Sequence, residues 1–157
     1  MITIITQRWL DLQMNVTELT PVAKAGILPY FNNGKNTWIL FMQPSNPEYG
    51  GSAFQIAKGG IDPGEDELTA ALREGSEELG LRSDNIKHTT KVMSSTITGL
   101  DETYNLTVFL AQIIDPDAFD TPHYETARSA WLSQAEYARY GRSSQQSIVN
   151  KAFSMLK

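Results

Sequence analysis

The hydrophobic period changes between residues 66 and 79, and this change limits the fold more than any other pattern in the chain. Small and aliphatic side chains there recur at the i, i+3, i+4, i+7 and i+11 spacing of one helix face. They are Leu68, Ala71, Leu72, Gly75 and Leu79. Gly80 follows them and predicts the end of a helix.

Strand-forming segments with many apolar and β-branched residues flank this helix on both sides. We expect strands at residues 22–31, 37–42, 53–57, 86–97, 104–114 and 130–132. The turn sequence Asn32-Asn33-Gly34-Lys35 predicts a hairpin between the first two, and residues 134–156 predict one or two amphipathic helices. The order of strands, helix, strands and helix predicts an α/β fold with a mixed sheet and helices packed on its faces.

Length and composition restrict the class of protein. The 157 residues suit one domain, expected to span residues 1–157, and 41% hydrophobic and 20% charged residues are typical of a globular chain. The net charge of −5 gives no general attraction to nucleic acid or anionic membranes, so polyphosphate binding must rest on local cations and metal. The absence of cysteine excludes disulfides and cysteine nucleophiles. Residues 1–12 lack the apolar core of a signal peptide and nothing resembles a membrane span, so a cytoplasmic location is expected.

Three glutamates share one side of the predicted helix. At 100° per residue, Glu74, Glu77 and Glu78 lie within about 100° of one another, opposite the apolar face. Glu77 and Glu78 are therefore expected on an exposed face. Like charges at these spacings repel, which favours a compensating cation, and a hard divalent ion such as Mg²⁺ takes carboxylate oxygens as ligands. The alternative is a solvated acidic surface, which the spacing alone would favour.

The segment before the helix shifts the balance toward a metal site. Lys58-Gly59-Gly60-Ile61-Asp62-Pro63-Gly64-Glu65 is a predicted loop whose glycines let the backbone approach an ion or a phosphate closely. Loop and helix together predict a cradle for metal and phosphate.

This loop and helix resemble the Nudix box of the MutT-like hydrolases. Gly59, five residues, Glu65, seven residues and then the run Arg73-Glu74-Gly75-Ser76-Glu77-Glu78-Leu79-Gly80-Leu81 fill every fixed polar and glycine position of that motif. Gly75 alone departs from it, since the family places an aliphatic residue there. Because glycine costs about 1 kcal/mol inside a helix, we expect a tight packing contact at this position. In such a box Arg73 would orient the carboxylates, paired with Glu65.

The resemblance implies a Nudix-type α/β/α sandwich with a mixed β-sheet. It also implies a Mg²⁺-dependent enzyme, with Mn²⁺ as an alternative metal, that hydrolyses a pyrophosphate bond. Glu77 and Glu78 would be metal ligands, and Glu74 would be a further ligand or the base that activates water. The Gly59 carbonyl would complete the metal shell.

Two stretches resemble particular subgroups of the family. Residues 55–65 are similar to the box entrance of dinucleoside polyphosphate hydrolases and of bacterial RNA 5′-pyrophosphohydrolases, which makes Lys58 and Gly60 candidate substrate-binding residues. Glu125, six residues before Trp131, resembles the glutamate outside the box that binds metal or activates water in animal-type diadenosine tetraphosphate hydrolases. A solvated lysine and an exposed loop glutamate are the alternatives.

The remaining signals on the substrate are weaker. Four aromatic residues are candidates for stacking on a nucleobase: Tyr49, Phe54, Tyr104 and Tyr124. Tyr49 is the one assigned to substrate binding, and Lys24 could reach substrate or face solvent. The tyrosine that the diadenosine tetraphosphate subgroup carries after the box is missing, because residues 95–98 are Ser-Thr-Ile-Thr. The proline that marks many ADP-ribose hydrolases is also absent, so neither marker decides.

Three functions follow as hypotheses. The first is hydrolysis of a dinucleoside polyphosphate such as diadenosine tetraphosphate, or of a 5′-phosphorylated RNA end. The second keeps the enzyme and changes the substrate to ADP-ribose, a nucleotide sugar or a nucleoside triphosphate. The third is a nucleotide-binding module without catalysis, which is disfavoured because such modules commonly lose box carboxylates. Many proteins of this family dimerise, so a homodimer is allowed, and no membrane partner is expected.

Overall fold

The computed structural model describes residues 21–49, 51–98 and 102–157; the predicted absence of a signal peptide concerns residues 1–12, outside these ranges. Within them six strands form one mixed sheet of order β4-β5-β1-β2-β6, with β3 also pairing with β1. The strands are β1 (Val22–Asn32), β2 (Thr37–Pro44), β3 (Ala57–Gly60), β4 (Ile86–Thr98), β5 (Thr103–Ile113) and β6 (Thr126–Leu132). β1 and β5 run parallel, and the other named pairs are antiparallel.

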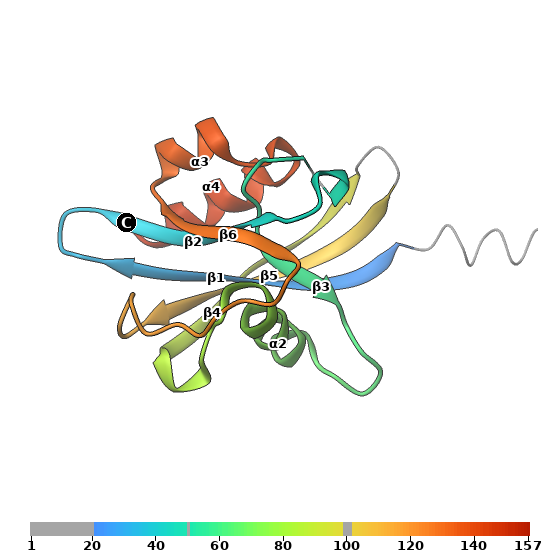
Figure 1. The fold of residues 1–157 in the computed structure, drawn as a ribbon, viewed down its shortest axis with the longest axis horizontal. Coiled ribbons are helices and arrows are strands. Elements are labelled where there is room, and N and C mark those ends of the chain that lie inside the picture. The colour runs from blue at the N-terminus through green and yellow to red at the C-terminus, as the bar shows by residue number, and fades with distance from the viewer. Residues whose placement is uncertain (1–20, 50, 99–101) are drawn as a thin grey trace, which may run out of the picture.

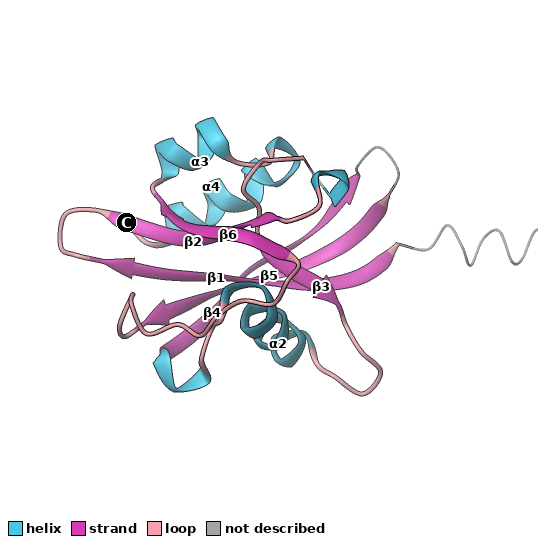
Figure 2. Cartoon of the chain, viewed as in Figure 1, coloured by secondary structure: helices cyan, strands magenta, loops and turns pink. Residues whose placement is uncertain are grey.

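Helices cover both faces of the sheet. The helix α2 (Glu67–Leu79) lies on one face, and α3 (Gln134–Tyr140) and α4 (Gln146–Met155) lie on the other (Figure 1). Figure 2 shows the strands as a middle layer between these helices. This arrangement confirms the predicted α/β sandwich with a mixed sheet. In the described part of the chain no helix is both long and apolar enough to cross a membrane.

The alternation of side chains along β1 creates two separate cores. Ala25 and Ile27 are fully buried in the core beneath α2, and Leu28 is fully buried in the core beneath α3 and α4. Burying one such aliphatic side chain contributes about 1.5–3 kcal/mol. Since successive side chains in a strand point to opposite faces, Lys24 and Gly26 lie on the α4 side.

The helix α2 has the ends that its sequence predicts. The Asp66 carboxylate caps it by accepting a hydrogen bond from the Thr69 N–H at 2.7 Å, and Gly80 ends it with a φ of 71°. Gly75 makes the expected tight contact, because a Cβ there would approach a methyl carbon of Ile27 to 2.7 Å and one of Leu81 to 2.9 Å. The missing side chain lets the helix lie close to β1.

Most predicted strands are confirmed, but the third is displaced. It was expected at residues 53–57, whereas β3 begins at Ala57 and includes Gly59 and Gly60. The reason is its pairing with β1, in register from Lys24 opposite Gly60 to Ile27 opposite Ala57. The first two glycines of the box therefore belong to a strand rather than to a loop.

One other strand is longer than predicted, whereas the C-terminal helices and the first hairpin agree with their predictions. The strand β6 begins at Thr126, four residues earlier than the predicted 130–132, because its partner β2 continues to Pro44. The C-terminal region forms two helices separated by the short 3-10 helix η3 (Ser143–Gln145). The hairpin between the first two strands is confirmed, with Asn32 opposite Thr37 and a φ of 93° at Gly34.

Candidate active site

The strand β3 and the helix α2 meet at Gly59 and Glu74. A Cβ at Gly59 would overlap the Glu74 carboxylate, so only glycine allows this contact. The alternation of β3 explains the direction, because Ala57 is buried in the core beneath α2 and Gly59, two residues on, faces the same way. Lys58, between them, extends to the opposite side of the sheet.

Arg73 ties the loop after β3 to the helix. Its guanidinium donates to both carboxylate oxygens of Glu65, at 2.8 and 2.9 Å, and to the carbonyl of Gly60 at 2.9 Å. It also donates to Glu74 at 2.9 Å and lies 3.6 Å from a Glu77 oxygen. The hydrogen bonds from Arg73 lower the pKa of Glu65 to about 2. The guanidinium thus fixes one oxygen of Glu74 in place.

Glu78 is buried, which corrects the expectation that it lies on an exposed face. It is 7% exposed, whereas the Glu77 side chain is 40% exposed. The last turn of α2 packs against β3, where a Glu78 oxygen accepts a hydrogen bond from the Lys58 backbone N–H at 3.2 Å. Burial raises the pKa of Glu78, and the neighbouring Glu74 carboxylate raises it further, while the charge of Lys58 opposes the rise.

The paired carboxylates of Glu74 and Glu78 could hold a divalent cation. A carboxyl whose pKa is raised by burial and by a second carboxylate becomes a stable anion when a cation binds beside it. Among the described residues no three histidine, aspartate or glutamate side chains form a metal-binding cluster by themselves. Since Mg²⁺ is usually held by one or two carboxylates together with substrate phosphate and water, this pair fits the ion. Glu77 and Gly59 line the same cleft as this carboxylate pair.

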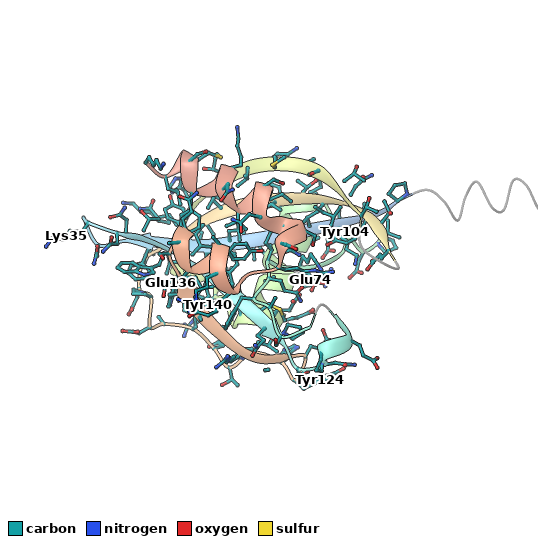
Figure 3. The ribbon with its side chains drawn as sticks, turned by 90° about the horizontal axis from the view of Figure 1, so that it is seen from above. Lys35, Glu74, Tyr104, Tyr124, Glu136 and Tyr140 are labelled. Carbon is teal, nitrogen blue, oxygen red and sulfur yellow. The ribbon has the colours of Figure 1, made fainter. Side chains whose placement is uncertain are left out.

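A cleft of about 1180 Å³ opens over these carboxylates. Figure 3 shows Glu74 and Tyr104 toward the middle of the molecule and Tyr124 at its margin, and all three line the cleft. Lys58 lines it as well, and burial, reinforced by the positive charge of Lys24, lowers the pKa of Lys58 to about 8. An amine with this pKa still carries most of its charge at neutral pH.

The other three predicted site residues lie in different environments. Glu125 lines the cleft, where its backbone carbonyl accepts a hydrogen bond from the Ser45 N–H at 2.9 Å. Gly60 is exposed beside the site, and its carbonyl is used by Arg73. Tyr49 belongs to the short helix η1 (Pro47–Tyr49), and its side chain lies outside what the structure describes.

The four aromatic candidates separate into different environments. Phe54 is buried beneath the Arg128 guanidinium, 5.5 Å from its ring centre, and Tyr104 is 1% exposed. Neither ring is free to stack on a base. Tyr124 is 87% exposed at the cleft and is the described aromatic residue best placed for stacking.

Sequence reasoning missed Arg142, which lines the cleft from the segment after α3. Its guanidinium donates to the Gln55 side chain at 2.8 Å, although the two residues are 87 positions apart. The neighbouring Gln145 is fully buried, and its side-chain oxygen accepts a hydrogen bond from the Ile56 N–H at 2.8 Å. No motif marks these positions, because their roles depend on how the end of the chain packs against residues 54–56.

Similarity to solved structures defines the class of fold. The Ap4A hydrolase of C. elegans, as a binary complex, superimposes with a TM-score of 0.72 at 23% identity, over 86% of this chain and 97% of that one. The NUDIX domain of Shewanella oneidensis NrtR, complexed with ADP ribose, gives 0.73 at 12% identity, over 88% and 90%. The M. smegmatis Nudix hydrolase RenU gives 0.67 at 15% identity, over 86% of each chain. At these identities the likeness establishes the fold.

The family model described as the NUDIX domain matches residues 20–151, and the chain belongs to the Nudix family. A comparison with curated protein sequences finds no match.

Proposed function

We propose that this protein is a pyrophosphohydrolase that cleaves a dinucleoside polyphosphate such as diadenosine tetraphosphate, with Mg²⁺ at the box carboxylates. One observation carries the proposal: the Glu74 carboxylate lies against Gly59 on the α2 side of β3, whereas the Lys58 ammonium lies over the Tyr104 ring on the α4 side, and all of these residues line one cleft. A phosphate chain across β3 would meet the metal at one phosphate and a positive charge at the next. The likeness in fold to an Ap4A hydrolase supports the same substrate class.

Several box residues would together hold the metal. Glu77 and Glu78 would bind the ion together with the Gly59 carbonyl, and Glu74 would be either a further ligand or the base that activates water. Arg73 would keep Glu74 in position through its 2.9 Å hydrogen bond. When bound, a divalent ion neutralises the pyrophosphate and lowers the pKa of water.

The proposed reaction joins a water oxygen to phosphorus and breaks the bond from that phosphorus to the bridging oxygen. The leaving phosphate keeps the electron pair, and the proton of the water passes to a carboxylate. Glu74 and Glu125 are the two candidates for that base, since both line the cleft. Lys58 would stabilise the charge that develops on the leaving phosphate. No covalent protein nucleophile is required.

Other substrates use the same chemistry. A 5′-phosphorylated RNA end presents a similar phosphate chain. ADP-ribose is the second candidate, favoured by the fold shared with a NUDIX domain that was solved in complex with it. We also propose that residues 1–157 form a single domain acting in the cytoplasm, with a homodimer as one allowed assembly.

Product identification across a substrate panel tests the proposal. Diadenosine tetraphosphate, triphosphorylated RNA, ADP-ribose and mononucleotides are incubated with the protein and Mg²⁺ or Mn²⁺, with a chelator as control. We expect metal-dependent release of ATP and AMP from diadenosine tetraphosphate, faster than attack on the other substrates. Protein that is folded but leaves diadenosine tetraphosphate and triphosphorylated RNA intact, while cutting another pyrophosphate, would contradict the proposed substrate class.

A further inference from the structure

A group of cations lies in the cleft on the side of β3 away from the box carboxylates. The Lys24 ammonium is 4.4 Å from the centre of the Tyr104 ring, and the Lys58 ammonium is 5.2 Å from the same centre. Tyr104 belongs to the core beneath α4, so both lysines extend to that face of the sheet. Two like charges over one ring repel each other, and an anion between them would relieve the repulsion.

Arg142 adds a third cation, and hydrogen bonds hold its backbone in place. Its N–H donates to the Phe54 carbonyl and its own carbonyl accepts from the Tyr137 hydroxyl, both at 2.8 Å. In the described structure Gln55 takes one hydrogen bond from its guanidinium. Because a guanidinium has five N–H donors, most of its capacity remains for a ligand in the cleft.

The hydroxyl of Tyr104 independently indicates a ligand. Tyr104 is 1% exposed and lines the cleft, and its hydroxyl is buried without a hydrogen-bond partner among the described residues. An unpaired buried hydroxyl is costly, and a phosphate oxygen would accept its hydrogen bond.

The acidic residues of the cleft define where an anion can bind. The lining contains six carboxylates, Glu48, Glu74, Glu77, Glu78, Glu102 and Glu125, and three cations, Lys24, Lys58 and Arg142. Among the cations, Lys24 is paired with Glu102 at 2.5 Å, and that carboxylate is about half exposed. A phosphate chain could displace so exposed a carboxylate, whereas the buried box carboxylates would repel it until metal binds.

We propose that Lys24, Arg142 and the Tyr104 hydroxyl, together with Lys58, form an anion subsite for phosphates beyond the one that is attacked. This subsite makes the protein prefer substrates with three or more consecutive phosphates to those with two. The inference rests on the proposed function, because it names the feature of the substrate that the same cleft recognises. Before substrate binds, Glu102 holds Lys24 in place, and the phosphate chain then takes the place of the Glu102 carboxylate.

Binding of inorganic tripolyphosphate and pyrophosphate, measured by calorimetry with Mg²⁺, tests the subsite directly. Wild-type protein should bind tripolyphosphate more tightly than pyrophosphate. Arg142→Met should weaken tripolyphosphate binding about tenfold, since a hydrogen bond to a charged group is lost, and Arg142→Lys should recover part of it. Arg139→Met is the matched control, because it removes the same charge from an exposed position on α3 outside the cleft.

Tyr104→Phe separates binding from folding. Since the hydroxyl has no described partner, its removal should leave the unfolding midpoint unchanged or higher, yet weaken tripolyphosphate binding about fivefold. If Tyr104 had only a structural role, Tyr104→Phe would leave the binding of tripolyphosphate unchanged. Wild-type binding by both Tyr104→Phe and Arg142→Met would overturn the subsite.

Kinetics distinguish failure of the subsite from failure of the proposed function. With diadenosine tetraphosphate, Arg142→Met should raise KM about tenfold and change kcat little, while the KM for ADP-ribose, which has one phosphate beyond the attacked one, should rise less. If wild type does not cleave diadenosine tetraphosphate, the proposed function fails, and the measurements of tripolyphosphate binding still test the subsite. If it does cleave this substrate and Arg142→Met has wild-type KM, the subsite alone fails.

Discussion

The two sides of β3 are built in different ways. On the α2 side, the carboxylates and the arginine that orients them come from one stretch of sequence, between Gly59 and Glu78. On the α4 side, Lys24, Tyr104 and Arg142 come from three distant parts of the chain. One loop and helix can hold a fixed set of metal ligands. The residues of a surface built from separate elements can change without moving those ligands. We therefore propose that the first side carries out catalysis and that the second selects the substrate.

The largest expected effect is on the carboxylate side. Glu78→Gln should reduce kcat at least about 100-fold, since even the outer partners of metal ligands are worth 10–100-fold. The amide keeps an acceptor for the Lys58 N–H and removes a buried carboxylate, so folding should persist although Glu78 is buried. Activity assays are read beside thermal unfolding. Turnover equal to wild type in folded Glu78→Gln would remove Glu78 from the metal site.

On the other side, the sharpest structural prediction concerns Gln145. Gln145→Leu leaves the buried Ile56 N–H without its acceptor, but it also removes a buried side-chain N–H group that has no partner among the described residues, so the free energy of unfolding should fall by about 1 kcal/mol. Urea denaturation measures this loss, and Gln146→Leu, at a less buried neighbouring position, is the control. Because residues 54–56 lead into Lys58, the KM of Gln145→Leu should rise more than its kcat falls. An unchanged free energy of unfolding would show that the hydrogen bond between Gln145 and Ile56 does not stabilise the segment before β3.

An effect of similar size is expected where the helix meets the sheet. Gly75→Ala gains about 1 kcal/mol in helix propensity but places a methyl group against Ile27 and Leu81, which costs about 1–3 kcal/mol. We expect a net loss of stability on the order of 1 kcal/mol, measured by urea denaturation. Stabilisation by this substitution would mean that α2 can move away from β1 without strain.

The smallest effect is a difference in stability at neutral pH that disappears in acid. The pKa of Glu65 is lowered from 4.5 to about 2, so its hydrogen bonds with Arg73 stabilise the fold above pH 4.5 and are lost as the pH falls from 4.5 to 2. Glu65→Gln should therefore unfold at a lower temperature than wild type near neutral pH, with the difference shrinking toward pH 2. Parallel unfolding midpoints across this range would show that Glu65 titrates normally.

The sequence allows the carboxylate side to be predicted because its information is local. The helix period and the stop at Gly80 lie between Asp66 and Gly80, the box spacing lies between Gly59 and Leu81, and the structure has the helix in that place. The burial of Glu78 was predicted wrongly for a physical reason. A helical wheel gives the direction of a side chain, but not that β3 packs over the last turn of the helix.

On the cation side, Lys24, Lys58 and Tyr104 were single candidates in the sequence, but their grouping with Arg142 could not be predicted, because these residues meet only after the sheet and the C-terminal helices have packed. Lys24 and Tyr104 come together through the parallel pairing of β1 with β5, and Arg142 through contacts with Phe54 and Gln55. Such long-range pairings leave no periodic signal in a single sequence. The same limit explains the displaced start of β3, whose bounds depend on its partner β1.

The ratio of kcat/KM for diadenosine tetraphosphate to that for ADP-ribose, measured on wild-type protein with Mg²⁺, tests the division of the cleft most directly. A metal site facing a group of cations should favour the longer phosphate chain, so we expect a ratio above one and loss of both activities with chelator. A ratio below one, in folded protein whose activity depends on metal, would contradict the assignment of the cation side to substrate selection.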